Sequence, residues 1–174
     1  LYATFDQLEK AGVDKMIVDL RYNSGGRISI AKLFGELLIG KDHDDAIAYR
    51  VKYNSDFSSE NVNRYFTKHS DSLGMDDIVF ITSGTTLSSS ELLINMMRPY
   101  ANVRTIGATT GGKPVGSRGY DFCEQSLTPI MFRMANADNQ TDYFDGFTPE
   151  CFASDDLERM LGDPEEAMLA TALE

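Results

Sequence analysis

The residues best suited to chemistry in this chain are a serine and a lysine, Ser88 and Lys113. Ser88 lies in a run of hydroxyl residues directly after an apolar, strand-like segment, and Lys113 ends a Gly-Gly-Lys turn further along the chain. A neutral lysine amine close to a serine hydroxyl can take its proton and so activate it as a nucleophile. The chain has only two histidines, and neither lies in a motif. If the protein is a serine hydrolase, a lysine is therefore the expected base.

The segment from Ser88 to Glu91 also has a structural interpretation. A serine followed three residues later by a glutamate is a capping box, in which each side chain binds a backbone N–H at the start of a helix. The two interpretations are compatible, because exposed N–H groups at a helix start can stabilise the oxyanion formed in acyl transfer. The turn at residues 23–26 offers glycine N–H groups for the same purpose, since glycine lets the backbone approach a ligand closely.

Lys113 has two other interpretations. By itself it fits a solvent-exposed lysine in a flexible loop, because lysine is seldom buried. Residues 107–113 also match the G-x-x-x-x-G-K pattern of phosphate-binding loops. Such a loop continues with Ser or Thr and then a helix, whereas Pro114 follows here, so we expect no nucleotide and no other cofactor. Residues 136–142 resemble a calcium loop but lack its glycine and its final glutamate, so we expect no metal either.

Composition limits the class of protein. The 174 residues suit one domain, and 16 basic against 27 acidic residues give a net charge of −11. That charge argues against a nucleic-acid partner and against an anionic membrane surface, because both would repel the protein. No stretch is long and apolar enough to span a membrane. The two cysteines, Cys123 and Cys151, fit either a disulfide in an exported protein or two unpaired buried thiols.

Apolar periodicity predicts an alternation of strands and helices. Short apolar runs at residues 16–20, 78–81 and 103–106 are typical of buried strands. Residues 30–38, 88–98 and 164–173 have helical patterns, and a further helix ends near residue 11 with Gly12 as its cap. We expect residues 41–76 to be irregular, and residues 128–134 to form part of a hairpin with its polar tip at 135–141. Strand, turn and helix in repetition predict an α/β fold with a mostly parallel sheet flanked by helices, plus a C-terminal hairpin region.

Four motifs in a fixed order resemble a known family, the C-terminal processing peptidases, also called tail-specific proteases. They are D-L-R-x-N-x-G-G at residues 19–26, T-x-S-x-S-E at 86–91, G-x-x-T-x-G-K at 107–113, and the closing segment at 145–150. Each motif is moderately specific, and the ordered set is highly specific. The resemblance covers residues 13–150, which is most of the chain.

The resemblance implies a serine–lysine peptidase domain with a ClpP/crotonase-like core. It implies Ser88 as the nucleophile, Lys113 as the general base, and an oxyanion hole made by N–H groups of Ser89 and of the Gly25-Gly26 turn. Members of the family cleave proteins near their C-termini, mostly in the bacterial cell envelope. We therefore expect an extracytoplasmic serine endopeptidase that forms an acyl-enzyme with protein or peptide substrates and needs no cofactor.

The chain departs from the family pattern at two places. The first residues of the usual S-A-S-A-S-E core are changed, and many members have glutamine four residues after the lysine, where this chain has Ser117. The shorter Ser117 hydroxyl either orients the lysine through a water molecule or does not orient it at all. We also expect the N-terminal part of the family's catalytic domain to precede Leu1. Residues 1–174 are then a single, N-terminally truncated catalytic domain without a PDZ-like domain, and the oligomeric state is left open.

A lysine acts as a base only when it is neutral, and burial favours the neutral form. We expect apolar neighbours such as Ile106, or the face formed by Leu92 and Met96, to bury Lys113. Two alternatives to the peptidase remain. One is a catalytically degenerate module that binds peptides on the same fold. The other is a crotonase-like acyl-CoA enzyme, although the basic surface that would bind CoA is not evident in this acidic chain.

Overall fold

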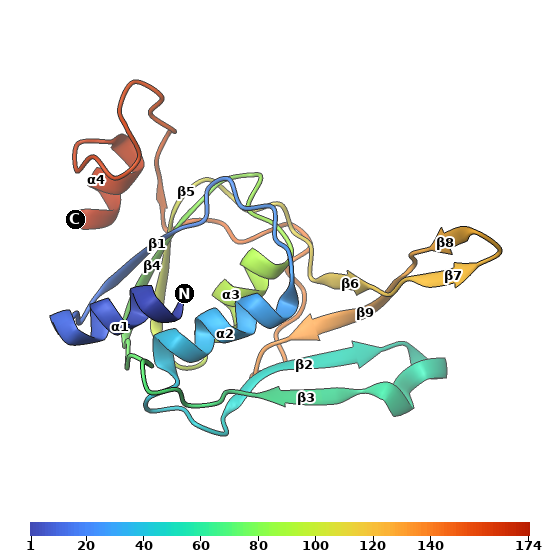
Figure 1. Ribbon diagram of the computed structural model, residues 1–174. Coiled ribbons are helices and arrows are strands. Elements are labelled where there is room, and N and C mark those ends of the chain that lie inside the picture. The colour runs from blue at the N-terminus through green and yellow to red at the C-terminus, as the bar shows by residue number, and fades with distance from the viewer.

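A four-stranded parallel sheet forms the centre of the computed structural model, which describes all residues from 1 to 174 (Figure 1). Its strands, in spatial order, are β1 (Met16–Asp19), β4 (Asp77–Thr82), β5 (Asn102–Gly107) and β10 (Cys151–Phe152). All three neighbouring pairs run parallel. The predicted parallel α/β core with its three apolar strands is therefore confirmed.

Helices cover both faces of this sheet, because its strands are apolar on both faces. In β4, Ile78 and Phe80 point into the main core, whereas Val79 and Ile81 point into a second cluster on the other face. The main core lies against α1 (Tyr2–Ala11), α2 (Ile28–Ile39) and α3 (Ser89–Met97), and the second cluster against α4 (Ala167–Leu173). The period of two along β4 thus decides which helix each side chain meets.

A second, antiparallel sheet lies beside the first. Its order is β3 (Val62–Tyr65), β2 (Ile47–Tyr53), β9 (Ile130–Ala135) and β6 (Val115–Ser117), and the 3-10 helix η1 (Ser55–Glu60) connects β2 to β3. A separate hairpin of β7 (Tyr120–Phe122) and β8 (Gln125–Leu127) projects from the body (Figure 1). No helix combines the length and the apolar content that crossing a bilayer requires.

The expectation of an irregular segment at residues 41–76 is wrong, because β2 and β3 lie there. Tyr49 and Val51 are buried while the alternate residues Arg50 and Lys52 are more exposed. This is the apolar and polar alternation of a strand with one buried face. Many charged residues flank β2 in the sequence, and they made its alternation difficult to recognise from the sequence alone.

The predicted hairpin tip is also misplaced. The tight turn lies at Cys123 and Glu124, whose φ angles are 44° and 62°. Residues 136–142 instead form a loop fastened to α3, where the Asn95 amide donates to the Gln140 carbonyl at 3.0 Å. The last helix begins at Ala167 rather than at Pro164, since Glu166 caps it.

Neither cysteine behaves as a buried thiol. Cys123 at the hairpin turn and Cys151 in β10 are both exposed and unpaired. Each of the two histidines contacts another side chain. His69 lies 3.1 Å from a carboxylate oxygen of the buried Glu36, and the ring of His43 lies 4.8 Å from that of Tyr100.

Candidate active site

Ser88 lies at the turn between β4 and α3, where it is the N-cap of the helix. Its backbone angles are φ 56° and ψ −115°, a combination that residues other than glycine rarely adopt. Such strain costs about 1–3 kcal/mol and persists only where the surrounding structure enforces it, typically at functional sites. The prediction that Ser88 starts a helix after a parallel strand is confirmed, and the strain indicates more than a capping role.

The hydroxyl groups around Ser88 are used to build the turn. The Thr85 hydroxyl donates to the carbonyl of residue 21, and the Thr86 hydroxyl to that of residue 20, at 2.8 and 2.7 Å. The Ser89 hydroxyl donates to the carbonyl of residue 26, and the Ser90 hydroxyl to that of residue 23, at 2.8 and 3.0 Å. These bonds tie the start of α3 to the segment that follows β1. The Ser88 hydroxyl differs from its neighbours because it donates to no group in the protein. Its proton is free for a base.

Glu91 connects the serine turn to the lysine turn. Its side chain is fully buried, and its carboxylate accepts four hydrogen bonds. One oxygen binds the Thr110 hydroxyl at 2.6 Å and the Gly112 N–H at 2.7 Å. The other oxygen binds the N–H groups of Ser88 at 2.9 Å and Lys113 at 2.8 Å. Because one oxygen atom holds both N–H groups, the backbones of Ser88 and Lys113 must lie close together.

The side chain of Lys113 is exposed, and no hydrogen bond joins its amine to the Ser88 hydroxyl. The expectation that apolar side chains of this chain bury the lysine is therefore wrong. Leu92 and Met96 are fully buried within the main core, and Ile106 packs in the cluster on the other face of the parallel sheet. These three side chains pack against other core residues and not against the lysine, so the lysine amine remains in contact with solvent.

The Gly25-Gly26 turn packs directly against Ser88. A Cβ added at Gly25 would lie 2.8 Å from the Ser88 Cβ and 3.0 Å from the Ser89 nitrogen, so only glycine fits there. The Gly25 N–H donates to the Asn23 side chain at 2.9 Å and is not free. The N–H groups of Gly26 and Ser89 have no acceptor in the protein. The structure thus leaves two free donors beside Ser88, and Gly25 serves to bring the turn close.

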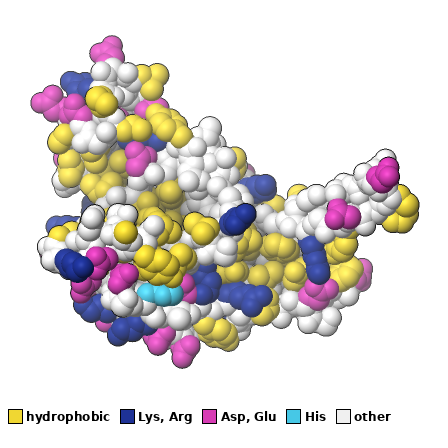
Figure 2. Space-filling view, viewed as in Figure 1, with side chains coloured by type: hydrophobic (Ala, Val, Ile, Leu, Met, Phe, Trp, Pro, Cys, Tyr) yellow, Lys and Arg dark blue, Asp and Glu magenta, His cyan; other side chains and the backbone are white.

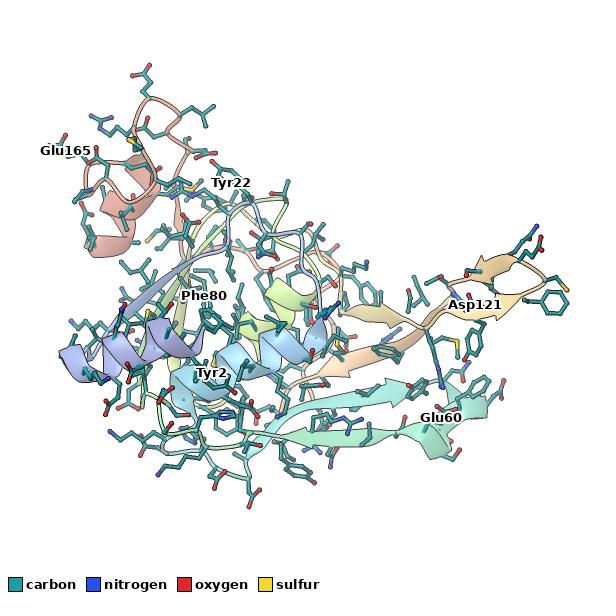
Figure 3. All side chains as sticks on the ribbon, viewed as in Figure 1. Tyr2, Tyr22, Glu60, Phe80, Asp121 and Glu165 are labelled. Atoms are coloured by element: carbon teal, nitrogen blue, oxygen red, sulfur yellow. The ribbon has the colours of Figure 1, made fainter.

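The turn after β1 is fixed from its other side by Arg21. This side chain is 1% exposed and pairs with Glu166 at 2.8 Å, Asp19 at 3.0 Å and Asp155 at 3.1 Å. The hydrogen bonds from Arg21 lower the pKa of the Glu166 carboxyl to about 2. Tyr22 also hydrogen-bonds Asp155 and reaches toward the C-terminal segment, as Figure 3 shows. The segment before α4 therefore holds the turn in place.

A cavity of about 530 Å³ opens beside the same turn. Most of its lining is apolar and comes from α1, α2 and β1, with Phe5, Ile30 and Phe34 among the side chains. Gly25, Gly26 and Ser89 form part of its wall, so the two free N–H donors are next to an apolar space. Such a space can accept an apolar side chain of a ligand that reaches Ser88.

The remaining predicted residue, Ser117, is exposed on β6 and forms no hydrogen bond with Lys113. The sequence analysis interpreted Glu91 only as part of a capping box. It predicted no individual role for Thr110 or Arg21. A signal for Glu91 was present, since it is the only charged residue among the nine of α3. Residues 107–113 are followed by a strand rather than a helix, in agreement with the argument against a phosphate loop.

Comparison with known proteins identifies relatives for this arrangement. The family model of Peptidase family S41 matches residues 1–150. A structure described as an S41 protease from Bacteroides fragilis superposes with a TM-score of 0.91 at 25% identity, over 99% of this chain and 47% of that one. The photosystem II D1 C-terminal processing protease superposes with a TM-score of 0.71 at 19% identity, over 99% and 42%. No curated protein sequence matches the chain.

The chain thus spans about half the length of these solved structures. The second of them, at 19% identity, supports the fold alone. The family model gives stronger evidence than this structure. It matches residues 1–150, and this range includes the glycine turn at residues 23–26, Ser88 and Lys113. On that evidence, the chain belongs to peptidase family S41.

Proposed function

We propose that this chain is the catalytic part of a serine endopeptidase in which Ser88 is the nucleophile and Lys113 the general base. The observation that carries the proposal is the buried Glu91 carboxylate, which holds the backbone of both residues on one oxygen atom. The strained backbone of Ser88 supports the same assignment, and so does its hydroxyl group, which donates no hydrogen bond within the protein.

In the proposed reaction, neutral Lys113 takes the hydroxyl proton while Ser88 attacks a peptide carbonyl carbon. The negative charge that develops on the carbonyl oxygen is stabilised by the free N–H groups of Gly26 and Ser89. Protonated Lys113 then gives its proton to the leaving amine, and an acyl-enzyme remains. Water, deprotonated by the same lysine, releases the new carboxyl end and restores Ser88.

The test uses the full-length protein that contains residues 1–174, called the parent protein below. The substrate is an unstructured protein with an apolar C-terminus. Ser88→Ala and Lys113→Ala should each abolish cleavage, and the double variant should be no worse than either, because groups that act in one proton transfer are not additive. Lys15→Ala, at an exposed lysine outside the site, is the matched control and should retain full activity. Full activity of Lys113→Ala would remove the lysine from the mechanism.

A catalytically degenerate peptide-binding module is the second candidate, and the exposure of Lys113 is the observation that favours it. A fluorophosphonate probe separates the two. Covalent labelling of the unmodified protein, lost in Ser88→Ala, supports the peptidase. Peptide binding without any labelling supports the binding module.

Cleavage near protein C-termini and an extracytoplasmic location are further proposals, which rest on the family resemblance of the motifs. Mass spectrometry of the products made from one long unstructured protein locates the cleaved bonds. Fractionation of cells that express the full-length protein locates the enzyme. Cleavage spread evenly along the substrate would contradict a preference for C-termini.

A further inference from the structure

A polar cavity lies on the antiparallel sheet, among β2, β3 and the loop that follows β9. Its volume is about 350 Å³, and its polar lining side chains are Arg50, Lys52, Asn61, Asn63 and Asn139. Arg50 and Lys52 are two residues apart in β2, so both side chains point to the same face of the sheet. Val51, between them, is buried in the main core, so the two cations lie on the face away from the core.

The two cations at this cavity have no carboxylate partner. The Arg50 guanidinium donates to the side-chain oxygen of Asn63 at 3.1 Å and to the Ala137 carbonyl at 3.2 Å. The Lys52 amine donates to the side-chain oxygen of Asn139 at 3.0 Å. By contrast, five other arginines of the chain pair with a carboxylate: Arg21, Arg104, Arg118, Arg133 and Arg159. Arg50 and Lys52 are both half-buried, and burial of a charge without a counter-ion is unfavourable, so the cavity presents positive charge that the protein does not neutralise.

The three asparagines add hydrogen-bond donors to the cavity. Arginine, lysine and a backbone N–H can only donate, so each asparagine must turn its oxygen toward such a partner. The Asn61 oxygen accepts from the Tyr53 N–H at 2.7 Å, as the oxygens of Asn63 and Asn139 accept from the two cations. The NH₂ groups of Asn61 and Asn139 then have no acceptor in the protein, and that of Asn63 has only a long contact of 3.5 Å with the Tyr65 hydroxyl. The lining side chains thus offer N–H groups and positive charge, and no carboxylate.

Much of the negative charge of the protein lies elsewhere. Residues 153–174 carry seven acidic side chains and one basic one, whereas residues 47–65, which include β2 and β3, carry two acidic and three basic ones. Figure 2 shows acidic side chains on the C-terminal segment around α4 and on the projecting hairpin. Asp138, in the same loop as Asn139, is exposed and pairs with neither Arg50 nor Lys52. The net charge of −11 is therefore compatible with an anion at this cavity.

We propose that this cavity binds the oxyanion group of a small hydrophilic ligand, either a phosphate or a carboxylate. The oxygens of both groups accept charge-assisted hydrogen bonds from arginine and lysine, and the free amide NH₂ groups donate further bonds. The volume is near the lower end of the range of small-molecule sites, roughly 300–1,000 Å³, so the cavity has room for a small ester or acid as well as a bare ion. Lys52 lies opposite Arg133 of β9, which lies opposite Val115 of β6, so two strand spacings, about 10 Å, separate Lys52 from the strand after the lysine turn. The inference does not depend on the proposed function.

The first experiment measures anion binding by the parent protein. Inorganic phosphate, glycerol 3-phosphate and acetate are each titrated by isothermal titration calorimetry, with the ionic strength held constant by sodium chloride. Lys52→Gln removes the amine and should weaken binding of the preferred anion about five- to tenfold, because a charge-assisted hydrogen bond is lost. Arg64→Gln makes the same change of charge at an exposed arginine of β3 outside the cavity, and should change the affinity by less than about twofold. Equal losses in the two variants would overturn the proposal, because they would reflect surface charge in general.

A second variant, Asn139→Asp, covers the case in which Lys52→Gln does not fold, as judged by circular dichroism. An aspartate keeps an oxygen that accepts from Lys52, and it tolerates the positive φ of 63° at this position. It replaces an NH₂ donor by a negative charge, which repels an anion in the cavity. Binding should weaken by more than about tenfold. Unchanged affinity in Asn139→Asp would refute the proposed site.

The choice of anions identifies the group that the cavity takes. Tighter binding of phosphate and glycerol 3-phosphate than of acetate assigns a phosphate group to the site, and the reverse order assigns a carboxylate. If none of the three gives saturable binding against the sodium chloride background, the cavity is not an oxyanion site and the proposal fails.

Discussion

Replacing the buried Glu91 by glutamine tests the connection between the serine and lysine turns most directly. The carboxylate accepts two hydrogen bonds at each oxygen, and a glutamine side chain keeps only one oxygen. Its NH₂ group must therefore face one pair of donors. Each buried donor left without an acceptor costs about 1–3 kcal/mol.

The two orientations of the glutamine have different costs. If the NH₂ faces Ser88 and Lys113, two backbone N–H groups lose their acceptor, which costs roughly 2–6 kcal/mol. If it faces Thr110 and Gly112, the Thr110 hydroxyl can rotate and accept from the NH₂ in addition to the Phe147 N–H, so one bond is kept with its direction reversed, while the Gly112 N–H and the Thr110 O–H lose their acceptor. The second orientation should prevail, and we expect Glu91→Gln to lower the free energy of unfolding by about 1–3 kcal/mol.

Gly112 directly precedes Lys113 in the sequence. Loss of the hydrogen bond from the Gly112 N–H in Glu91→Gln should therefore shift the lysine turn. A displacement of about 1 Å at a catalytic group can reduce the rate about 100-fold. We therefore expect kcat/KM of the parent protein to fall about 10- to 100-fold in Glu91→Gln. Urea unfolding followed by circular dichroism gives the stability, and cleavage of an unstructured protein gives the rate.

The matched control is Glu36→Gln. Glu36 is also buried and accepts from the Thr67 N–H as well as from Lys32 and His69, but it lies outside the candidate site. It should lose a similar amount of stability and keep its activity. The reasoning is refuted if Glu91→Gln is as stable as the unmodified protein, or if both variants lose the same fraction of activity.

Two further predictions concern the turn after β1. Gly25→Ala should destabilise the protein by at least about 2 kcal/mol more than Gly162→Ala, because both glycines have positive φ but only Gly25 would also place a Cβ 2.8 Å from neighbouring atoms; equal losses in urea unfolding would contradict the close packing at Ser88. The lowered pKa of Glu166, about 2 against an ordinary 4.5, means that its pairing with Arg21 stabilises the fold fully above pH 4.5 and progressively less as the pH falls toward 2. The shift corresponds to about 3 kcal/mol, and this acid-dependent part of the unfolding free energy should be absent in Glu166→Gln.

The sequence alone determined those features that depend on a few adjacent residues. The apolar runs specify the strands of the parallel sheet, since a strand covered on both faces must be apolar throughout. Gly12 ends α1 with φ 66°, as its freedom at positive φ allows, and Ser88 with Glu91 starts α3. The order of the serine, lysine and glycine motifs was enough to indicate the family.

Only the tertiary structure decided how those local features meet. Whether the Gly25 N–H is free depends on the Asn23 side chain, and whether Lys113 is buried depends on which side chains the core has already taken. The second role of Glu91 arises because the chain returns through β5 to place Gly112 and Lys113 beside α3. The place of β9 in the antiparallel sheet likewise depends on its pairing with β2, which lies far earlier in the chain. Contacts between distant segments are selected by burial and by the pairing of backbone groups across the whole fold, and no local pattern of residues encodes them.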